Sequence, residues 1–117
     1  MSIEELDATG LAAEIRAGRL SAREAVADAI ARIEDARELN AVVHERFEQA
    51  LAEADDVPAG PLAGVPTLVK DLGIQVAGLP LTNGSRLFAE QVSDVDSHLV
   101  TLLRRAGLVI LGSTNTP

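Results

Sequence analysis

A lysine stands at the end of an apolar, strand-like run in "PLAGVPTLVKDLG", residues 61–73. A lysine amine serves as a general base only when it is neutral. That requires an environment that lowers a lysine pKa from about 10.4 towards 7, which is about 4–5 kcal/mol of environmental work. Asp71 would oppose such a shift unless its carboxylate points away from Lys70. The plainer interpretation is a solvated lysine at a strand end, loosely paired with Asp71, because lysine is seldom fully buried.

The other polar residues that could do chemistry give weaker signals. His44 and His98 have no His, Cys or carboxylate at a convincing metal-ligand spacing. Asp94 and Asp96 fit the charge pattern of a helix N-terminus better than a metal site. Ser85, in the glycine-containing "NGS", is interpreted as a structural loop residue. No dinucleotide or Walker glycine motif is present, so we expect neither a cofactor nor a metal.

The first half of the chain is predicted to be helical. Residues 2–5, "SIEE", and residues 21–24, "SARE", both fit the capping box, in which a Ser hydroxyl and a Glu three residues later satisfy free backbone donors. Apolar residues at helical spacing follow the second box, so we expect a helix over residues 21–37. A shorter helix is expected over residues 9–17. Gly18 would end it, because glycine tolerates the left-handed conformation found after a helix.

The second half of the chain combines strands with helices. A long loop rich in glycine and turn-forming residues, "GIQVAGLPLTNGSR", separates the second strand from the last helix and is long enough to suggest a functional role. Strand, helix, strand is the βαβ unit, so the last two strands should be parallel with a right-handed crossover. The expected elements are a strand at 40–44, a helix after it that ends before "DDVPAGP", a strand at 66–70, a helix at 94–106 whose apolar face carries Val95, Leu99, Leu102, Leu103 and Ala106, and a strand at 108–111.

Composition limits the possible functions. A chain of 117 residues with 47% apolar residues suits one α/β domain with one core. A net charge of −8 argues against nucleic-acid or anionic-membrane partners, which require clustered Lys and Arg. The absence of cysteine suits a reducing cytoplasm. No signal peptide or membrane span is recognisable, so a cytoplasmic location is expected.

The last predicted strand, "LVIL", is followed only by "GSTNTP". A strand of this apolar type is normally covered on both faces and has neighbours, so an open edge beyond it would leave unpaired backbone groups. Two hypotheses stay open. The chain is the first part of a larger protein, or it is a complete α/β interaction module that associates through an open strand edge. In either case the isolated chain is expected to self-associate or to be poorly stable.

Several motifs, in order and together covering nearly the whole chain, resemble the N-terminal part of the amidase signature family. The resemblance is nearest to bacterial broad-range or aminohexanoate-type amidases. The motifs are "LSAREAVADAIARIEDARELNAVV", "GPLAGVPTLVKDLG", "AGLPLTNGSR" and "DSHLVTLLRRAGLVILGSTNTP".

The resemblance implies a larger α/β fold with a mixed central sheet and a Ser-Ser-Lys triad that hydrolyses a carboxylic amide through an acyl-serine intermediate. Lys70 matches the lysine of that triad. The two serines of the family lie in a glycine- and serine-rich segment after "TNTP", and this sequence has no such segment. Residues 1–117 are therefore expected to be one N-terminal segment of an amidase domain, inactive in isolation, whose substrate is a small-molecule amide.

Overall fold

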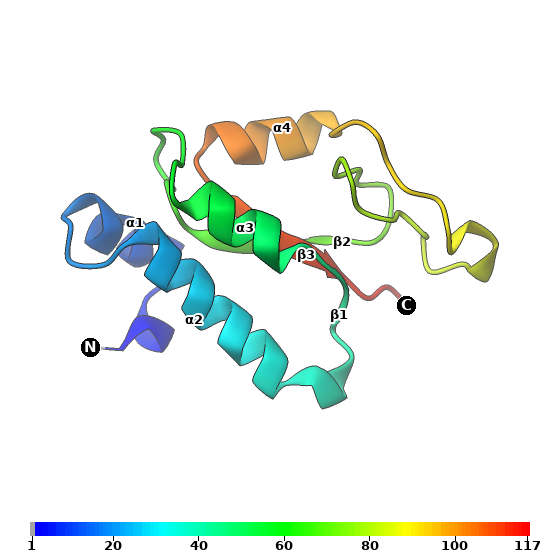
Figure 1. The fold of residues 1–117 in the computed structure, drawn as a ribbon, viewed down its shortest axis with the longest axis horizontal. Helices are drawn as coiled ribbons and strands as arrows, with labels where there is room; N and C mark the ends of the chain where they lie inside the picture. The colour runs from blue at the N-terminus through cyan, green and yellow to red at the C-terminus, as the bar shows by residue number, and fades with distance from the viewer. Residues whose placement is uncertain (1) are drawn as a thin grey trace.

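The computed structural model describes residues 2–117, which form helices on both faces of a three-stranded sheet (Figure 1). Strand β1 (Val42–Glu45) pairs antiparallel with β3 (Val109–Thr114), and β2 (Pro66–Lys70) pairs parallel with β3. The predicted mixed sheet and parallel pair are therefore confirmed. The expectation that the last strand borders an open edge is wrong, because β1 returns to cover it and β3 becomes the central strand.

Each face of the sheet has its own helices. Helices α2 and α3 pack on one face, over Val109 and Leu111 of β3, whereas α4 packs on the other, over Val69 and Ile110. The buried hydrophobic side chains of the core are all aliphatic, with valine and alanine the most frequent. The helices are α1 (Ala8–Arg16), α2 (Ala22–Asp35), α3 (Phe47–Ala54) and α4 (His98–Arg105), with short 3-10 turns at η1 (Ile3–Glu5), η2 (Arg37–Leu39) and η3 (Arg86–Phe88).

One of the two predicted capping boxes forms. The Ser21 hydroxyl accepts a hydrogen bond from the Glu24 backbone N–H at 3.0 Å, and the Glu24 carboxylate accepts one from the Ser21 N–H at 3.1 Å. The box predicted at Ser2 is wrong, because the Ser2 side chain caps nothing and only the short turn η1 follows it. Helix α1 is capped instead by Asp7, whose carboxylate accepts a hydrogen bond from the Gly10 N–H at 2.7 Å.

Helix α4 starts four residues later than the sequence suggests. The Asp96 carboxylate accepts a hydrogen bond from the Ala77 N–H at 2.8 Å, and the Ser97 N–H donates to the Gln75 carbonyl at 2.9 Å. These contacts fasten the segment before the helix to the start of the long loop, and residues 94–97 are not helical. The helix then begins at His98.

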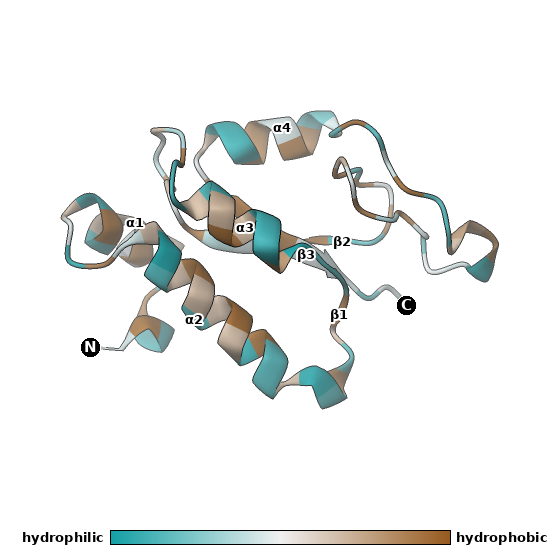
Figure 2. Cartoon of the chain, viewed as in Figure 1, coloured by the Kyte–Doolittle hydropathy of each residue, from teal (hydrophilic) through white to brown (hydrophobic). Residues whose placement is uncertain are grey.

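The face of α4 that packs on the sheet also differs from the predicted one. Val100 is fully buried and Leu103 is partly buried against the same cluster, whereas Leu99 and Leu102 are 48% and 46% exposed. Figure 2 shows hydrophobic and hydrophilic residues mixed along this helix. The predicted stripe therefore contains one contact with the sheet, at Leu103, and leaves much of its apolar surface uncovered.

A buried arginine joins both helical layers to the central strand. The Arg46 guanidinium, 8% exposed, donates to the Ile110 carbonyl at 2.6 Å and forms an ion pair with Glu53 of α3. Arg104 of α4 lies 3.3 Å from the same Glu53 carboxylate. Burial alone would raise the pKa of Glu53, but the hydrogen bonds and positive charges of the two arginines outweigh burial and hold the pKa below its ordinary value.

Candidate active site

Lys70 is the last residue of β2 and lies beside Thr114 of β3 in the parallel register. The carboxyl ends of parallel strands are the usual place for ligand sites in α/β proteins. Lys70 is exposed there, and it is the only lysine in the sequence. The structure therefore places the predicted catalytic residue where a catalytic site of this fold class is expected.

The neighbouring Asp71 points away from Lys70. Its side chain is 4% exposed, whereas that of Lys70 is exposed, as expected for successive residues on opposite faces of a strand. Among residues 2–117, Lys70 forms no ion pair with any carboxylate. The solvated lysine of the plainer interpretation is present, because Lys70 is exposed, but its loose pairing with Asp71 is absent from the described part of the chain.

The Asp71 carboxylate has contacts with two distant segments. One oxygen accepts from the Thr82 N–H at 2.8 Å, and the other accepts from the Thr82 hydroxyl at 2.5 Å. The second oxygen also lies 3.3 Å from Nε2 of His44 on β1. The Asp71 backbone N–H donates to the Thr114 carbonyl at 3.0 Å. One buried carboxylate thus ties the end of β2 to β1 and to the long loop.

The loop that carries Thr82 has further polar contacts beside the strand ends. The Thr82 hydroxyl accepts from the Gly84 N–H at 3.2 Å, and the Asn83 side chain accepts from the Gly73 N–H at 3.0 Å. A Cβ at Gly84, whose φ is +71°, would lie 2.5 Å from the Thr116 hydroxyl. The positive φ and this close approach both favour glycine, at the place where the loop lies against the segment that follows β3.

Other polar residues are engaged in local structure or exposed to solvent. The Ser85 hydroxyl accepts from the Leu87 N–H at 3.2 Å and caps η3, which agrees with the structural interpretation. The Asn115 side chain donates to the Asn40 carbonyl at 3.1 Å and so ties two neighbouring loops. His98 is exposed at the start of α4. In residues 2–117 no three His, Asp or Glu side chains gather where they could hold a metal ion.

The contact between His44 and Asp71 was not predicted. The two residues lie 27 positions apart, His44 on β1 and Asp71 directly after β2, so no local pattern links them. Pairing β1 with β3 places His44 opposite Ser113, whose hydroxyl is buried and finds no hydrogen-bond partner among the described residues. Strand pairing, which a single sequence does not reveal, brings this group together.

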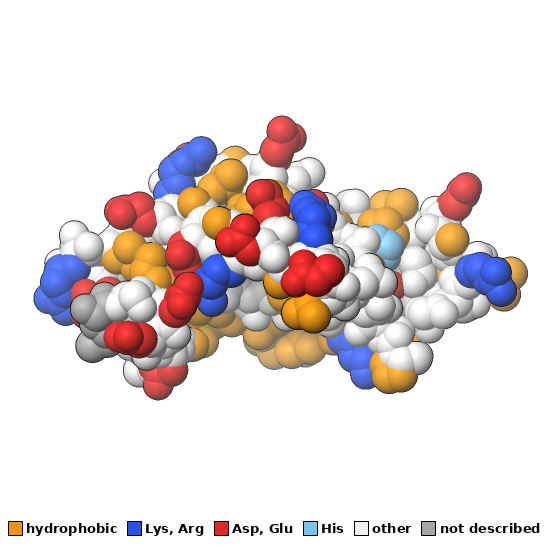
Figure 3. Space-filling model, turned by 90° about the horizontal axis from the view of Figure 1, so that it is seen from below, with side chains coloured by type: hydrophobic (Ala, Val, Ile, Leu, Met, Phe, Trp, Pro, Cys, Tyr) orange, Lys and Arg blue, Asp and Glu red, His pale blue; other side chains and the backbone are white. Residues whose placement is uncertain are grey.

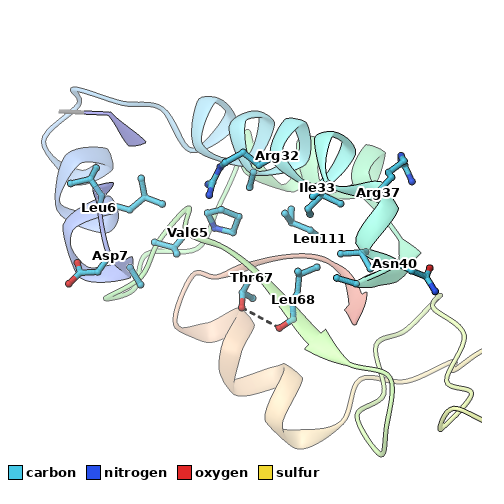
Figure 4. Close-up of a pocket in the computed structure, with 17 residues that line it drawn as sticks. Leu6, Asp7, Arg32, Ile33, Arg37, Asn40, Val65, Thr67, Leu68 and Leu111 are labelled. Carbon is cyan, nitrogen blue, oxygen red and sulfur yellow. Dashed lines mark hydrogen bonds between the residues drawn. The ribbon is translucent and has the colours of Figure 1, made fainter. Parts of the chain in front are cut away.

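An apolar groove of about 620 Å³ lies between α1, α2 and β2, away from Lys70 (Figure 4). Figure 4 shows Ile33, Leu68 and Leu111 lining it. Its charged rim residues are already engaged, since Arg32 is paired with Asp28 at 2.9 Å and Arg37 with Glu45 at 2.6 Å. The groove therefore offers apolar surface but no group poised for catalysis.

The mixed α/β fold sets the broad structural class, and comparison with known proteins identifies the family. A family profile described as Amidase matches residues 24–117. The chain belongs to the amidase signature family, as its motifs predict.

Two of the individual matches show the range of the curated relatives. A 6-aminohexanoate-cyclic-dimer hydrolase of Paenarthrobacter ureafaciens is 39% identical over 95% of this chain and 23% of its own length. A glutamyl-tRNA(Gln) amidotransferase subunit of Salinispora tropica is 37% identical over 97% of this chain and 24% of its own length.

Solved structures agree with these matches. The structure of a 6-aminohexanoate cyclic dimer hydrolase superposes with a TM-score of 0.91 at 36% identity, over all of this chain and 24% of that one. Native peptide amidase from Stenotrophomonas maltophilia gives a TM-score of 0.84 at 34% identity, over 95% of this chain and 25% of that one. The chain thus spans about a quarter of the length of the relatives it matches.

None of its helices within residues 2–117 has the length and apolar character needed to cross a membrane.

Proposed function

We propose that these residues form the N-terminal part of an amidase in which Lys70 is the general base. In its neutral form the Lys70 amine accepts a proton, through a bridging serine, from a second serine hydroxyl. The oxygen of that second serine attacks the amide carbonyl. The C–N bond breaks, the amine or ammonia leaves with a proton, and water then releases the acid from the acyl-serine. Both serines belong to a segment outside residues 1–117.

The position of Lys70 is the main support for this role. The Lys70 side chain stands exposed at the carboxyl edge of the parallel strand pair, while the adjacent Asp71 carboxylate is buried and satisfied by Thr82. A lysine paired with a carboxylate would be held in its charged form, because a nearby opposite charge favours ionisation. Lys70 forms no ion pair among residues 2–117. No neighbouring carboxylate there opposes a role as general base.

Substitution of Lys70 in the complete protein tests the role directly. Lys70→Ala and Lys70→Arg should each lower kcat for amide hydrolysis by at least about 10²-fold, since general-base catalysis contributes about 10²–10⁴-fold. Arginine preserves the charge but cannot become a neutral base. Arg105→Ala, which removes an exposed cation that forms no ion pair within residues 2–117, is the control. Near-normal turnover by Lys70→Arg would overturn the assignment.

The isolated chain of 117 residues should be inactive, because a base without a nucleophile has nothing to activate. The measurement is incubation with an amide substrate and, separately, with a serine-reactive probe. Turnover or covalent labelling of the isolated chain would contradict the proposal. The complete protein, treated in parallel, is the positive control.

The proposed substrate is a small carboxylic amide. A cyclic amide of 6-aminohexanoate is the first to test, because the chain is 39% identical to a hydrolase named for that substrate. Glutamine is the second, because several matches at 37–42% identity are named as amidotransferase components. Hydrolysis of the cyclic amide without glutaminase activity would place the protein with the first group.

We also propose that the isolated chain self-associates. Strands β1 and β2 are both sheet edges, and the outer face of α4 exposes Leu99 and Leu102. Figure 3 shows apolar side chains between the charged ones on one face of the molecule. Sedimentation over a hundredfold range of concentration should show a rising mass. A constant monomer mass would refute this.

A further inference from the structure

We infer that Asp71, held by Thr82 and His44, is a positioning residue that fixes Lys70 in place for catalysis. This inference rests on the proposed base role of Lys70. It starts from the fact that Asp71 is nearly completely buried, although an exposed loop follows it directly. A buried carboxylate is costly unless donors satisfy it, so its partners are a specific part of this fold.

The donors around the carboxylate are complementary to an ionised group. Thr82 supplies two of them, its N–H at 2.8 Å and its hydroxyl at 2.5 Å, and so binds both oxygens at once. His44 faces the second oxygen from β1 at 3.3 Å. An asparagine at this position would offer one acceptor oxygen, and its NH₂ group would face a donor. The site therefore requires a carboxylate, which a role as simple space filler would not.

The geometry transmits this anchoring to Lys70 through a single peptide unit. Asp71 follows Lys70 directly, and its backbone N–H donates to the carbonyl of Thr114, the residue that lies beside Lys70 in the register. Fixing both the side chain and the backbone of Asp71 sets the direction in which β2 ends. Because side chains alternate along a strand, an inward Asp71 also directs Lys70 to the opposite face.

Thr82 also couples Lys70 to the loop. Its hydroxyl donates to Asp71 and accepts from the Gly84 N–H, so loss of the hydroxyl frees both the carboxylate and the loop tip. Misplacement of a catalytic group by about 1 Å can cost about 10²-fold in rate. Loosening this group should therefore lower kcat, while groups that bind substrate elsewhere keep KM.

The test uses the complete protein and measures kcat and KM for amide hydrolysis in Thr82→Val, Thr82→Ser and Asp71→Asn. Thr82→Val replaces the hydroxyl by a methyl group of similar size. Thr82→Ser keeps the hydroxyl and removes the methyl group. We expect Thr82→Val and Asp71→Asn to lower kcat by about 10- to 100-fold with KM changed less than about threefold. Thr82→Ser should stay within about threefold of the parent in both. Thr101→Val removes a hydroxyl that bonds only within the α4 segment, and it should leave both constants unchanged.

Lys70→Ala, measured in the same series, separates this inference from the proposed function. Loss of activity in Lys70→Ala with parental kcat in Thr82→Val and Asp71→Asn would overturn the positioning role and leave the base assignment standing. Parental activity in Lys70→Ala would overturn the base assignment itself. Equal losses in Thr82→Val and Thr82→Ser would also count against positioning, because the hydroxyl would then not be the group that matters.

Discussion

Two regions of this molecule are held together by different forces. The packed layers, which are helices α2, α3 and α4 with strand β3, meet through buried apolar side chains. The site loop, residues 71–97, buries Val76 and Leu79 against the α4 layer, but the segment beside Lys70 is shaped by hydrogen bonds within the loop to Asp71 and Asn83. Apolar burial is proportional to area and tolerant of direction, whereas hydrogen bonds fix direction with modest net energy. Stability should therefore depend on the packed layers, and the geometry of the site on the loop.

The largest expected difference in unfolding free energy between the two regions comes from a Leu→Ala substitution in each. Leu111→Ala in β3, 2% exposed, should lower the free energy of unfolding by about 2–5 kcal/mol, because it removes buried methyl groups and leaves a cavity. Leu87→Ala in the site loop, 83% exposed, should change it by less than about 0.5 kcal/mol. Urea unfolding of the chain at monomeric concentration measures both. Similar losses in the two variants would break the comparison.

The same division explains what the sequence could predict. Strand β2 was expected at residues 66–70 and forms there, because an apolar run that starts at a proline leaves little choice. The late start of α4 could not be foreseen, since it depends on the contact between Asp96 and Ala77, which come from opposite ends of the site loop. Local patterns predict the packed layers well because helical spacing and strand composition are local properties.

The site was predictable only in part. Lys70 was identified by motif resemblance, and its place at the strand edge followed from the βαβ order. The support for Lys70 was missed, because Thr82 and His44 reach Asp71 across 11 and 27 residues of sequence. Hydrogen bonds over such distances follow from strand pairing and loop closure, which one sequence does not encode in any local pattern.

Two glycines with positive φ give the next largest contrast. A Cβ at Gly107, between α4 and β3, would lie 2.5 Å from the Ala63 Cα, whereas a Cβ at Gly73, in the site loop, would meet nothing within 4 Å. Gly107→Ala should cost about 2–4 kcal/mol from strain plus overlap with a packed backbone, and Gly73→Ala about 1–2 kcal/mol from strain alone. Thermal and urea unfolding measure both, and equal costs would mean that packing around Gly107 adds nothing.

The pH dependence of the unfolding free energy compares the two regions through one glutamate in each, Glu53 in α3 and Glu90 in the site loop. The pKa of Glu53 is held below 4.5 despite burial, because Arg46 and Arg104 favour its ionised form. A lowered folded pKa stabilises the fold above about pH 4.5, and that contribution is lost as pH falls through the folded value. Glu53→Gln should cost about 1–3 kcal/mol at pH 7, with the difference from the parent shrinking below pH 4.5.

Glu90→Gln makes the same substitution in the exposed part of the site loop and is the control for Glu53→Gln. It should leave the unfolding free energy within about 0.5 kcal/mol of the parent at neutral pH. A gap between Glu53→Gln and the parent that stays constant from pH 7 to pH 3 would contradict the ionic explanation, because a neutral Glu53 would then stabilise the fold as well as a charged one.

The smallest contrast concerns three serines at the starts of helical segments. Ser21→Ala removes a complete capping box from α2, a helix of fourteen residues, and should cost about 1 kcal/mol. Ser85→Ala removes the cap of a three-residue turn in the site loop and should cost less than about 0.5 kcal/mol. Ser2→Ala, at a capping pattern that does not form, should cost nothing measurable. Circular dichroism during urea unfolding ranks the three. A cost for Ser85 equal to that for Ser21 would mean that the loop shares the cooperative unfolding of the packed layers, and the two regions would then differ in their contacts but not in their stability.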